Sequence, residues 1–239
     1  MDAQAALKQR RAALLNEMGL APVWRLRRPL PGQQAVADAK ARDWEELHAR
    51  VAACQACALG LQRRPARPVA GAGGHATHEA HVADWLVVGD APETDEVQQG
   101  QVMSGPAGGL LTAMLAALGV CCNQEVYFTQ VVKCPPPEHQ PPSPQEMAAC
   151  QPFLLRQIEL LQPRLILALG KTVAQGLLPQ DTPEPLSSLR GRLFQYHGVP
   201  LLVTHAPAWL LGHPEDKAQA WEDLCLAQNI VQADGAAVV

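Results

Sequence analysis

The sequence predicts an α/β protein of three layers, in which helices cover both faces of a parallel sheet. Short, continuously apolar segments alternate along the chain with longer segments that have the apolar periodicity of helices. A chain of 239 residues is long enough for one such domain with additional segments at its ends. The 48% apolar content is that of a globular protein.

Four strands and four helices are expected in regular alternation. The expected strands are 84–89, 125–133, 164–169 and 199–204. The expected helices are 106–119, 143–162, 171–178 and 214–232. Because the strands are apolar throughout, both of their faces should be buried. Sites in such sheets form in the loops after the strand ends, here 90–105, 133–142, 170–171 and 204–212.

The segments that flank this alternation differ from it in composition. A helix is expected over 40–53, and the Gly-, Pro-, Arg- and His-rich stretch 60–83 is expected to be loop. We divide the chain into an N-terminal extension with a helix (1–31), a linker (32–39), the α/β domain (40–232) and a disordered tail (233–239). The sequence shows neither a signal peptide nor a membrane-spanning run, so we expect a cytoplasmic protein.

Charge is distributed unevenly along the chain. Residues 1–28 hold six basic and two acidic side chains, whereas the remainder holds 13 basic and 21 acidic side chains. Affinity for nucleic acid comes largely from Lys and Arg side chains that neutralise phosphates. Any face of the acidic domain that binds DNA must therefore be a local patch.

Four of the seven cysteines are spaced as the ligands of a metal site. Cys54-x2-Cys57 ends the helix 40–53, Cys134 follows a strand, and Cys150 comes 16 positions later. Four thiolates hold zinc or an iron–sulfur cluster, and a zinc ribbon usually shows two C-x2-C pairs, which favours the cluster. Buried apolar cysteines are the alternative. The remaining three are interpreted as structural: Cys121, Cys122 and Cys225.

A series of motifs over about residues 50–228 allows a more specific interpretation. They are CQACALGLQRR, LVVGDAP, SGPAGGLLTAML, the stretch from VYFTQVVKC to LILALG, SLRG and VTHAPAWLL. In this order they resemble the family 4 uracil-DNA glycosylases, the iron–sulfur branch of that superfamily. The resemblance implies a four-stranded parallel sheet between helices, and a 4Fe-4S cluster on Cys54, Cys57, Cys134 and Cys150. It also implies an enzyme that flips uracil out of DNA and hydrolyses its N-glycosidic bond.

The base pocket of this chain departs from the family pattern. Asp90 follows Gly89 where the family has a Glu that activates or positions water, and Glu93 replaces the Gly of the same motif. Met103 stands where the family stacks uracil on a Phe, and Gln130 stands where an Asn reads the uracil edge. A carboxylate one methylene shorter displaces the reacting groups, and such errors cost about a hundredfold in rate.

The last motif departs furthest from the pattern. Aligned on Pro207, the family's catalytic His falls on Ala206, and His205 stands one residue early. In an extended backbone this shift turns the side chain to the opposite face, so His205 should miss the pocket. Each altered group removes about 2–4 kcal/mol of transition-state stabilisation, so we expect a non-catalytic protein. The alternatives are an active or divergent uracil-DNA glycosylase of base-excision repair that uses Asp90 and His205, or a protein that binds DNA without cleaving it.

The N-terminal extension resembles a docking peptide. Residues 9–29 have the basic pair Arg10-Arg11, then Met18-Gly19-Leu20, Trp24 and Leu26-Arg27-Arg28-Pro29. This order resembles the N-terminal segment of the psi subunit of the bacterial DNA polymerase III clamp loader. The resemblance implies docking on the tau/gamma subunits, and it makes the chi subunit a second candidate partner. The expected docking residues are Arg10, Arg11, Leu14, Met18, Leu20, Trp24, Leu26 and Arg27.

We therefore expect a non-catalytic iron–sulfur protein that serves as a psi-like subunit in DNA replication. It should bind DNA weakly at most and no membrane. Trp24 beside arginines is typical of an interface anchor. Two alternatives stay open for the extension: packing on its own domain, with Trp24 in a core gap, or direct contact of its basic residues with DNA.

Overall fold

The computed structural model describes residues 43–62, 72–73, 83–93, 96, 102–122, 124–137, 140–178 and 185–236. The expected docking segment 1–31 and linker 32–39 lie outside these residues. The last helix runs to Ala236, into the segment 233–239 that was expected to be a tail. Among the described helices, none is both long and apolar enough to span a membrane.

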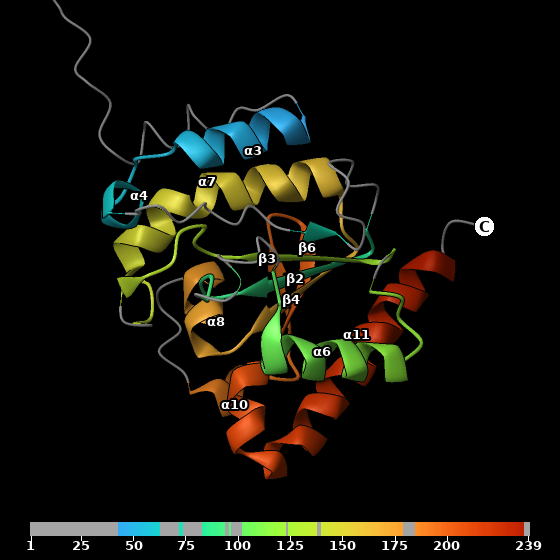
Figure 1. Cartoon of the computed structure of the whole chain (residues 1–239). Coiled ribbons are helices and arrows are strands. Elements are labelled where there is room, and N and C mark those ends of the chain that lie inside the picture. The colour runs from blue at the N-terminus through green and yellow to red at the C-terminus, as the bar shows by residue number, and fades with distance from the viewer. Residues whose placement is uncertain are drawn as a thin grey trace, which may run out of the picture. The chain divides into compact units, whose positions relative to one another are not determined.

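A six-stranded sheet forms the middle layer of the domain, in the order β1-β3-β2-β4-β6-β5 (Figure 1). Its centre is parallel and consists of β3 (Val126–Gln130), β2 (Trp85–Gly89), β4 (Leu165–Leu169) and β6 (Val199–Thr204). The predicted four-stranded parallel sheet is therefore confirmed as the core of a larger sheet. The two edge strands are antiparallel to their neighbours: β1 (Ala72–Gly73) and β5 (Leu193–Tyr196).

The prediction missed both edge strands for different reasons. β1 has two residues within the stretch 60–83, where no apolar run marks a strand. β5 joins β6 through His197-Gly198, and Tyr196 pairs with Val199. Both loop residues have positive φ, 49° and 86°, as tight hairpin turns require. The His197-Gly198 dipeptide, directly before the apolar strand β6, is therefore the sequence signal of this hairpin.

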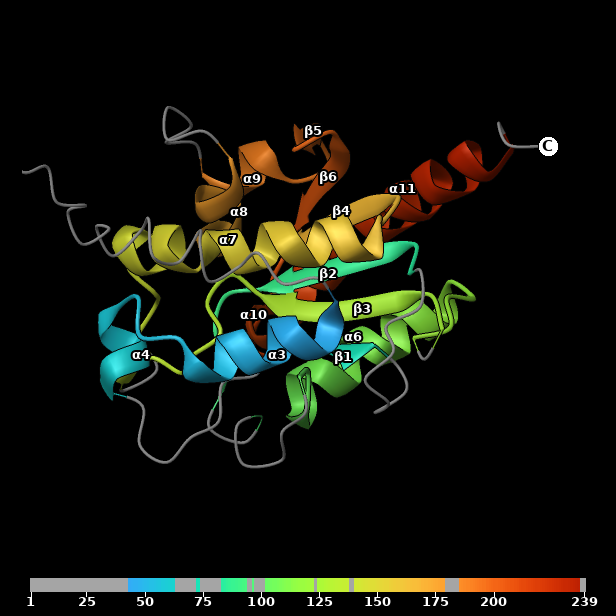
Figure 2. The ribbon, with the colours of Figure 1, turned by 90° about the horizontal axis from the view of Figure 1, so that it is seen from above.

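Successive residues of the central strands pack into two separate hydrophobic clusters, one on each face of the sheet. In β2, Leu86 and Val88 belong to one cluster, whereas Trp85 and Val87 belong to the other. The first cluster includes α3 (Trp44–Ala53), α7 (Pro144–Leu161) and α8 (Lys171–Leu177). The second includes α6 (Gly105–Ala117) and α11 (Lys217–Ala236), and the two helical layers are visible in Figures 1 and 2. The continuous apolar strands are explained by this burial on both faces.

Each predicted helix of the α/β domain is present, with small differences at the ends. The expected helix 214–232 begins as the 3₁₀ turn η2 (Pro214–Asp216), followed by α11. Three short helices were not expected: α4 (Ala58–Gln62), α9 (Leu186–Leu189) and α10 (Pro207–Gly212). They have four to six residues, which is too short for a helical period to be seen.

The strand β3 is shorter than the predicted strand 125–133. It ends at Gln130, after which Val131 N donates to Gly89 O (2.9 Å) and Val132 N donates to Asp90 O (3.2 Å). The chain then bends, and Lys133 Nζ donates back to Gln130 O. This bend places Gln130 at the edge of the sheet where sites form.

Candidate functional site

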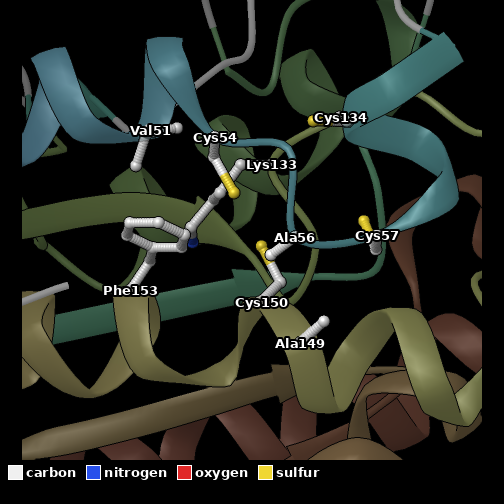
Figure 3. A pocket seen from close by; sticks show the side chains of 10 residues that line it. Val51, Cys54, Ala56, Cys57, Lys133, Cys134, Ala149, Cys150 and Phe153 are labelled. Atoms are coloured by element: carbon white, nitrogen blue, oxygen red, sulfur yellow. The ribbon is translucent and has the colours of Figure 1, made fainter. Parts of the chain in front are cut away.

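The structure brings the four predicted ligand cysteines together around one small cavity (Figure 3). Cys54 and Cys57 come from the connection between α3 and α4, Cys134 follows β3, and Cys150 lies on α7. Cys134 and Cys150 are buried, and Cys54 and Cys57 are half-buried. Figure 3 shows the four sulfur atoms arranged around a common space. The other three cysteines do not line this cavity.

The surroundings of these cysteines suit a thiolate-bound group. Val51 and Phe153 supply apolar walls, and the empty volume is about 280 Å³ including the open mouth of the cavity. The turn of Cys54 is packed against Gly60, where an added Cβ would approach Cys54 O to 2.9 Å. Four sulfur donors in an apolar site, with a cation beside them, match the chemistry of an iron–sulfur cluster.

The cation is Lys133, whose side chain is fully buried beside the cysteines. Its Nζ donates to Thr129 Oγ1 (2.7 Å), to Gln157 Oε1 (2.8 Å) and to Gln130 O (2.5 Å). Burial lowers the pKa of Lys133 to about 8, and the charge of Cys150 opposes that shift. Burial likewise raises the pKa of the Cys150 thiol to about 12, and Lys133 opposes that. The ammonium group therefore balances negative charge on the thiolate site.

A second cavity, with an empty volume of about 470 Å³ including its open mouth, lies at the carboxyl ends of the central strands. It is lined by Gly89, Asp90, Ala91, Glu93, Glu96, Met103, Ser104, Ala107, Gly108, Gln130, Leu169, Ala206, Pro207 and Ala208. All five positions that the sequence assigned to the base pocket are among these residues: Gly89, Asp90, Met103, Gln130 and Ala206. The cavity thus lies where parallel sheets place their ligands.

Glycine residues shape this second cavity. A Cβ on Gly89 would lie 3.2 Å from Met103 Cε and 3.5 Å from Gln130 Cγ, so both side chains rest on the glycine. A Cβ on Gly108 would lie 1.7 Å from Met103 O, which excludes every other residue there. Met103 itself has a φ of 57°, and its conformation is held by this close approach of α6.

Asp90 and Gln130 present different groups to the cavity. Asp90 is exposed, and its Oδ1 accepts a hydrogen bond from Ala91 N (2.9 Å). Gln130 is 2% exposed, and its Nε2 donates to Glu96 Oε2 (2.7 Å). Its Oε1 is buried without a hydrogen-bond partner among the described residues. The site therefore offers an accessible carboxylate and an unsatisfied amide oxygen.

Glu96 is a site residue that the sequence analysis did not single out. It is 5% exposed and accepts hydrogen bonds from Met103 N (2.5 Å), Glu93 N (3.1 Å) and Gln130 Nε2 (2.7 Å). Burial raises the pKa of Glu96, and the hydrogen bonds from Glu93 and Met103 oppose the rise. The only available signal was its position in the expected site loop 90–105.

The structure places His205 outside the second cavity, whereas its neighbour Ala206 lines it. His205 is buried, and neither ring nitrogen has a hydrogen-bond partner among the described residues. Burial raises the pKa of Asp223 of α11, and His205 is the last of several neighbours that oppose this rise. Asp223 accepts from Thr204 Oγ1 (2.9 Å) and from Arg190 Nε (3.2 Å) and Nη2 (3.1 Å). His205 thus lies near the hydrogen-bonded group of Asp223, Thr204 and Arg190 and not in the second cavity.

Fold and site together define the class of protein. A family model described as the uracil DNA glycosylase superfamily matches residues 77–225, and the chain belongs to this superfamily. A Type-4 uracil-DNA glycosylase of Pyrobaculum aerophilum is 35% identical over 190 residues, which is 77% of this chain and 92% of the relative. One from Thermotoga maritima is 33% identical over 189 residues, 78% of this chain and 93% of the relative. The chain is therefore a member of the type-4 family.

These relatives correct the functional prediction. A third Type-4 uracil-DNA glycosylase, of Archaeoglobus fulgidus, is 34% identical over 139 residues, 56% of this chain and 69% of the relative. The prediction of a non-catalytic, psi-like clamp-loader subunit is wrong, because the similar proteins are glycosylases. The prediction weighted a resemblance of about 20 residues above the resemblance of the whole domain. Docking of residues 1–31 on other proteins stays an untested prediction.

Replacing Lys133 tests its role beside the cysteines. Lys133→Met leaves Thr129, Gln157 and Gln130 O without their shared donor. We expect a loss of about 1–3 kcal/mol of unfolding free energy and fewer iron atoms retained per chain. Anaerobic thermal unfolding and iron analysis provide the measurements. Lys171→Met, at an exposed position, is the matched control, and equal stability and iron content of the two variants would contradict the role.

Glu96 gives a pH-dependent prediction. The unfolded carboxyl releases its proton near pH 4.5, whereas burial holds the native pKa higher. Between these two values the native state binds more protons, so unfolding free energy falls as pH rises. Glu96→Gln removes this dependence, and its melting temperature relative to wild type should rise with pH across this window and stay level above it. A difference that does not change between pH 4.5 and 8 would show that Glu96 titrates normally.

Proposed function

We propose that the protein is a uracil-DNA glycosylase that removes uracil from DNA in base-excision repair. The observation that carries the proposal is the second cavity, where Asp90, Gln130 and Ala206 converge from separate strand ends. These are the positions that the family resemblance assigns to water activation, base reading and leaving-group stabilisation. The similarity to glycosylases over about three quarters of the chain supports the same activity.

The reaction assigns separate roles to the two polar side chains at the cavity. The flipped uracil enters the cavity, and the amide of Gln130 reads its edge. Asp90, at the exposed mouth, orients the water whose oxygen forms the new bond to the sugar carbon C1′. The bond from C1′ to the uracil N1 breaks, and its electron pair leaves with the base. The water proton passes to the Asp90 carboxylate or to solvent, and the uracil anion is protonated later.

Two of the differences from the family pattern lead us to propose that the enzyme turns over slowly. Met103 packs against the base by dispersion where the family stacks an aromatic ring. Ala206 supplies no imidazole to stabilise the uracil anion, and the buried His205 is absent from the cavity lining. Loss of one such preorganised group lowers kcat by about 10²–10³. We therefore propose slow turnover on uracil-containing DNA.

We also propose that Cys54, Cys57, Cys134 and Cys150 hold a 4Fe-4S cluster. When bound, this group supplies iron–thiolate bonds that cross-link the α3–α4 connection to β3 and α7. The four residues surround one cavity, and Lys133 places a positive charge beside them. The cross-link would be attached through Cys134, which follows the strand β3 that carries Gln130.

A uracil-release assay on single-stranded and double-stranded DNA tests the activity. We expect release by wild type, and a loss of at least about a hundredfold in Asp90→Asn, because the variant cannot accept the water proton. Asp84→Asn is the matched control at the opposite end of β2, where the Asp84 side chain forms a 3.8 Å ion pair with Arg164. Failure of wild type to release uracil from either DNA would refute the proposed function.

Restoring the imidazole provides an independent gain-of-function test. Ala206→His directs a ring into the cavity, and we expect kcat to rise by about a hundredfold. Gly170 allows the close approach of this segment, since a Cβ there would lie only 3.1 Å from Ala206 Cβ. Ala206→Leu controls for side-chain volume and should give no gain. Equal rates for the His and Leu variants would show that the missing imidazole does not limit the reaction.

A further inference from the structure

Both carboxylate oxygens of Glu96 accept hydrogen bonds from residues that line the second cavity. Oε1 accepts from Met103 N (2.5 Å), and Oε2 accepts from Glu93 N (3.1 Å) and Gln130 Nε2 (2.7 Å). The side chain is 5% exposed, and all three donors belong to residues that line the cavity. Glu96 therefore connects the loop after β2 to the end of β3.

The contact with Glu96 fixes which way the Gln130 amide faces. An ionised carboxylate only accepts hydrogen bonds, so above the pKa of Glu96 it is Nε2 rather than Oε1 that faces it. The remaining amide groups are one N–H of Nε2 and the buried, unpartnered Oε1. The rest of the residue is also held, because Gln130 O accepts from Lys133 Nζ (2.5 Å) and Cγ packs over Gly89.

A fixed amide reads one order of hydrogen-bonding groups on a base edge. Its remaining N–H and Oε1 complement an edge with a carbonyl oxygen next to an N–H, which uracil presents at O4 and N3. Cytosine presents an amino group in place of O4 and an unprotonated N3, so both contacts are mismatched. Sites that leave buried polar groups unpaired with the wrong substrate reject it strongly.

We infer that Glu96 is the positioning residue that makes the pocket select a carbonyl-next-to-N–H base edge over the edge of cytosine. The inference rests on the proposed function for the identity of the ligand, a flipped pyrimidine in DNA. Glu96 acts through Gln130, because its carboxylate accepts hydrogen bonds from three protein groups of the cavity lining. Its removal should change the preference between bases more than it changes binding to DNA.

Binding to uncleavable DNA tests the inference without any chemistry. The probes are oligonucleotides with one 2′-fluoroarabino-uracil or one 2′-fluoroarabino-cytosine in otherwise identical sequences. Wild type should prefer the uracil probe by about a hundredfold or more. In Glu96→Gln the amide of residue 96 both donates and accepts, so Gln130 can face either way, and the preference should fall below about tenfold.

Further variants separate positioning from folding. Glu96→Ala should lose the preference in the same way, and Glu96→Asp should recover part of it, because a carboxylate again faces the amide. Glu159→Gln, an exposed carboxylate on α7, is the control and should keep the full preference. Circular dichroism melting identifies any variant that fails to fold, and the preference is read from those that fold.

The outcomes distinguish the inference from the proposed function. Wild type that binds both probes equally, or binds neither, overturns the inference. A folded Glu96→Gln or Glu96→Ala protein that keeps the full preference also overturns it. If wild type prefers uracil but releases none, the proposed activity fails while the role of Glu96 is judged by its variants alone.

Discussion

The buried ammonium group of Lys133 is the interaction on which both cavities depend. A cation removed from water needs acceptors, and here two come from β3 and one from α7. Gln130 O belongs to the residue that lines the base cavity, and Gln157 Oε1 belongs to the helix that carries Cys150. The bend of the chain after β3 brings Lys133 Nζ back to Gln130 O. The hydrogen bond from Lys133 to Gln130 thus connects a residue of the cysteine cavity with a residue of the base cavity.

This arrangement explains how a type-4 scaffold can tolerate change in its pocket. Three of the positions that differ from the family pattern, Asp90, Met103 and Ala206, are not among the groups that Lys133 Nζ binds. The groups that Lys133 holds are backbone and core atoms, which do not depend on those three side chains. The residues at the opening of the base cavity are therefore different from those that connect β3 with α7.

Most of the fold could be predicted from the sequence because burial on both faces leaves a simple pattern. Strands such as LILAL, and the long helix around Cys150, are apolar over enough residues to be recognised. The short elements could not be found this way, since α9 has four residues and β1 has two. The positions of the four cysteines and of Gln130 were also predictable, because a motif matched each of them.

Contacts between loops were the part of the site that the sequence did not reveal. Glu96 is one of several acidic residues in its loop, and only the structure distinguishes it by its burial and by the Gln130 amide. The one-residue offset of His205 was readable from the motif, but its association with Asp223 depends on how α11 crosses the sheet. The function could not be predicted from the N-terminal segment, because a resemblance of about 20 residues is less specific than the similarity of the whole domain.

The hairpin of β5 and β6 has a consequence for how the protein behaves in concentrated solution. An outer strand with free backbone groups is a template on which another chain can assemble. Here that strand has only four residues, and the guanidinium of Arg192 lies 5.2 Å from the ring centre of Phe194. A short edge strand offers few backbone groups on which another chain could extend the sheet. The charged group over its aromatic residue opposes such pairing as well. Lengthening this strand, or replacing the arginine by an apolar residue, would create a site of self-association.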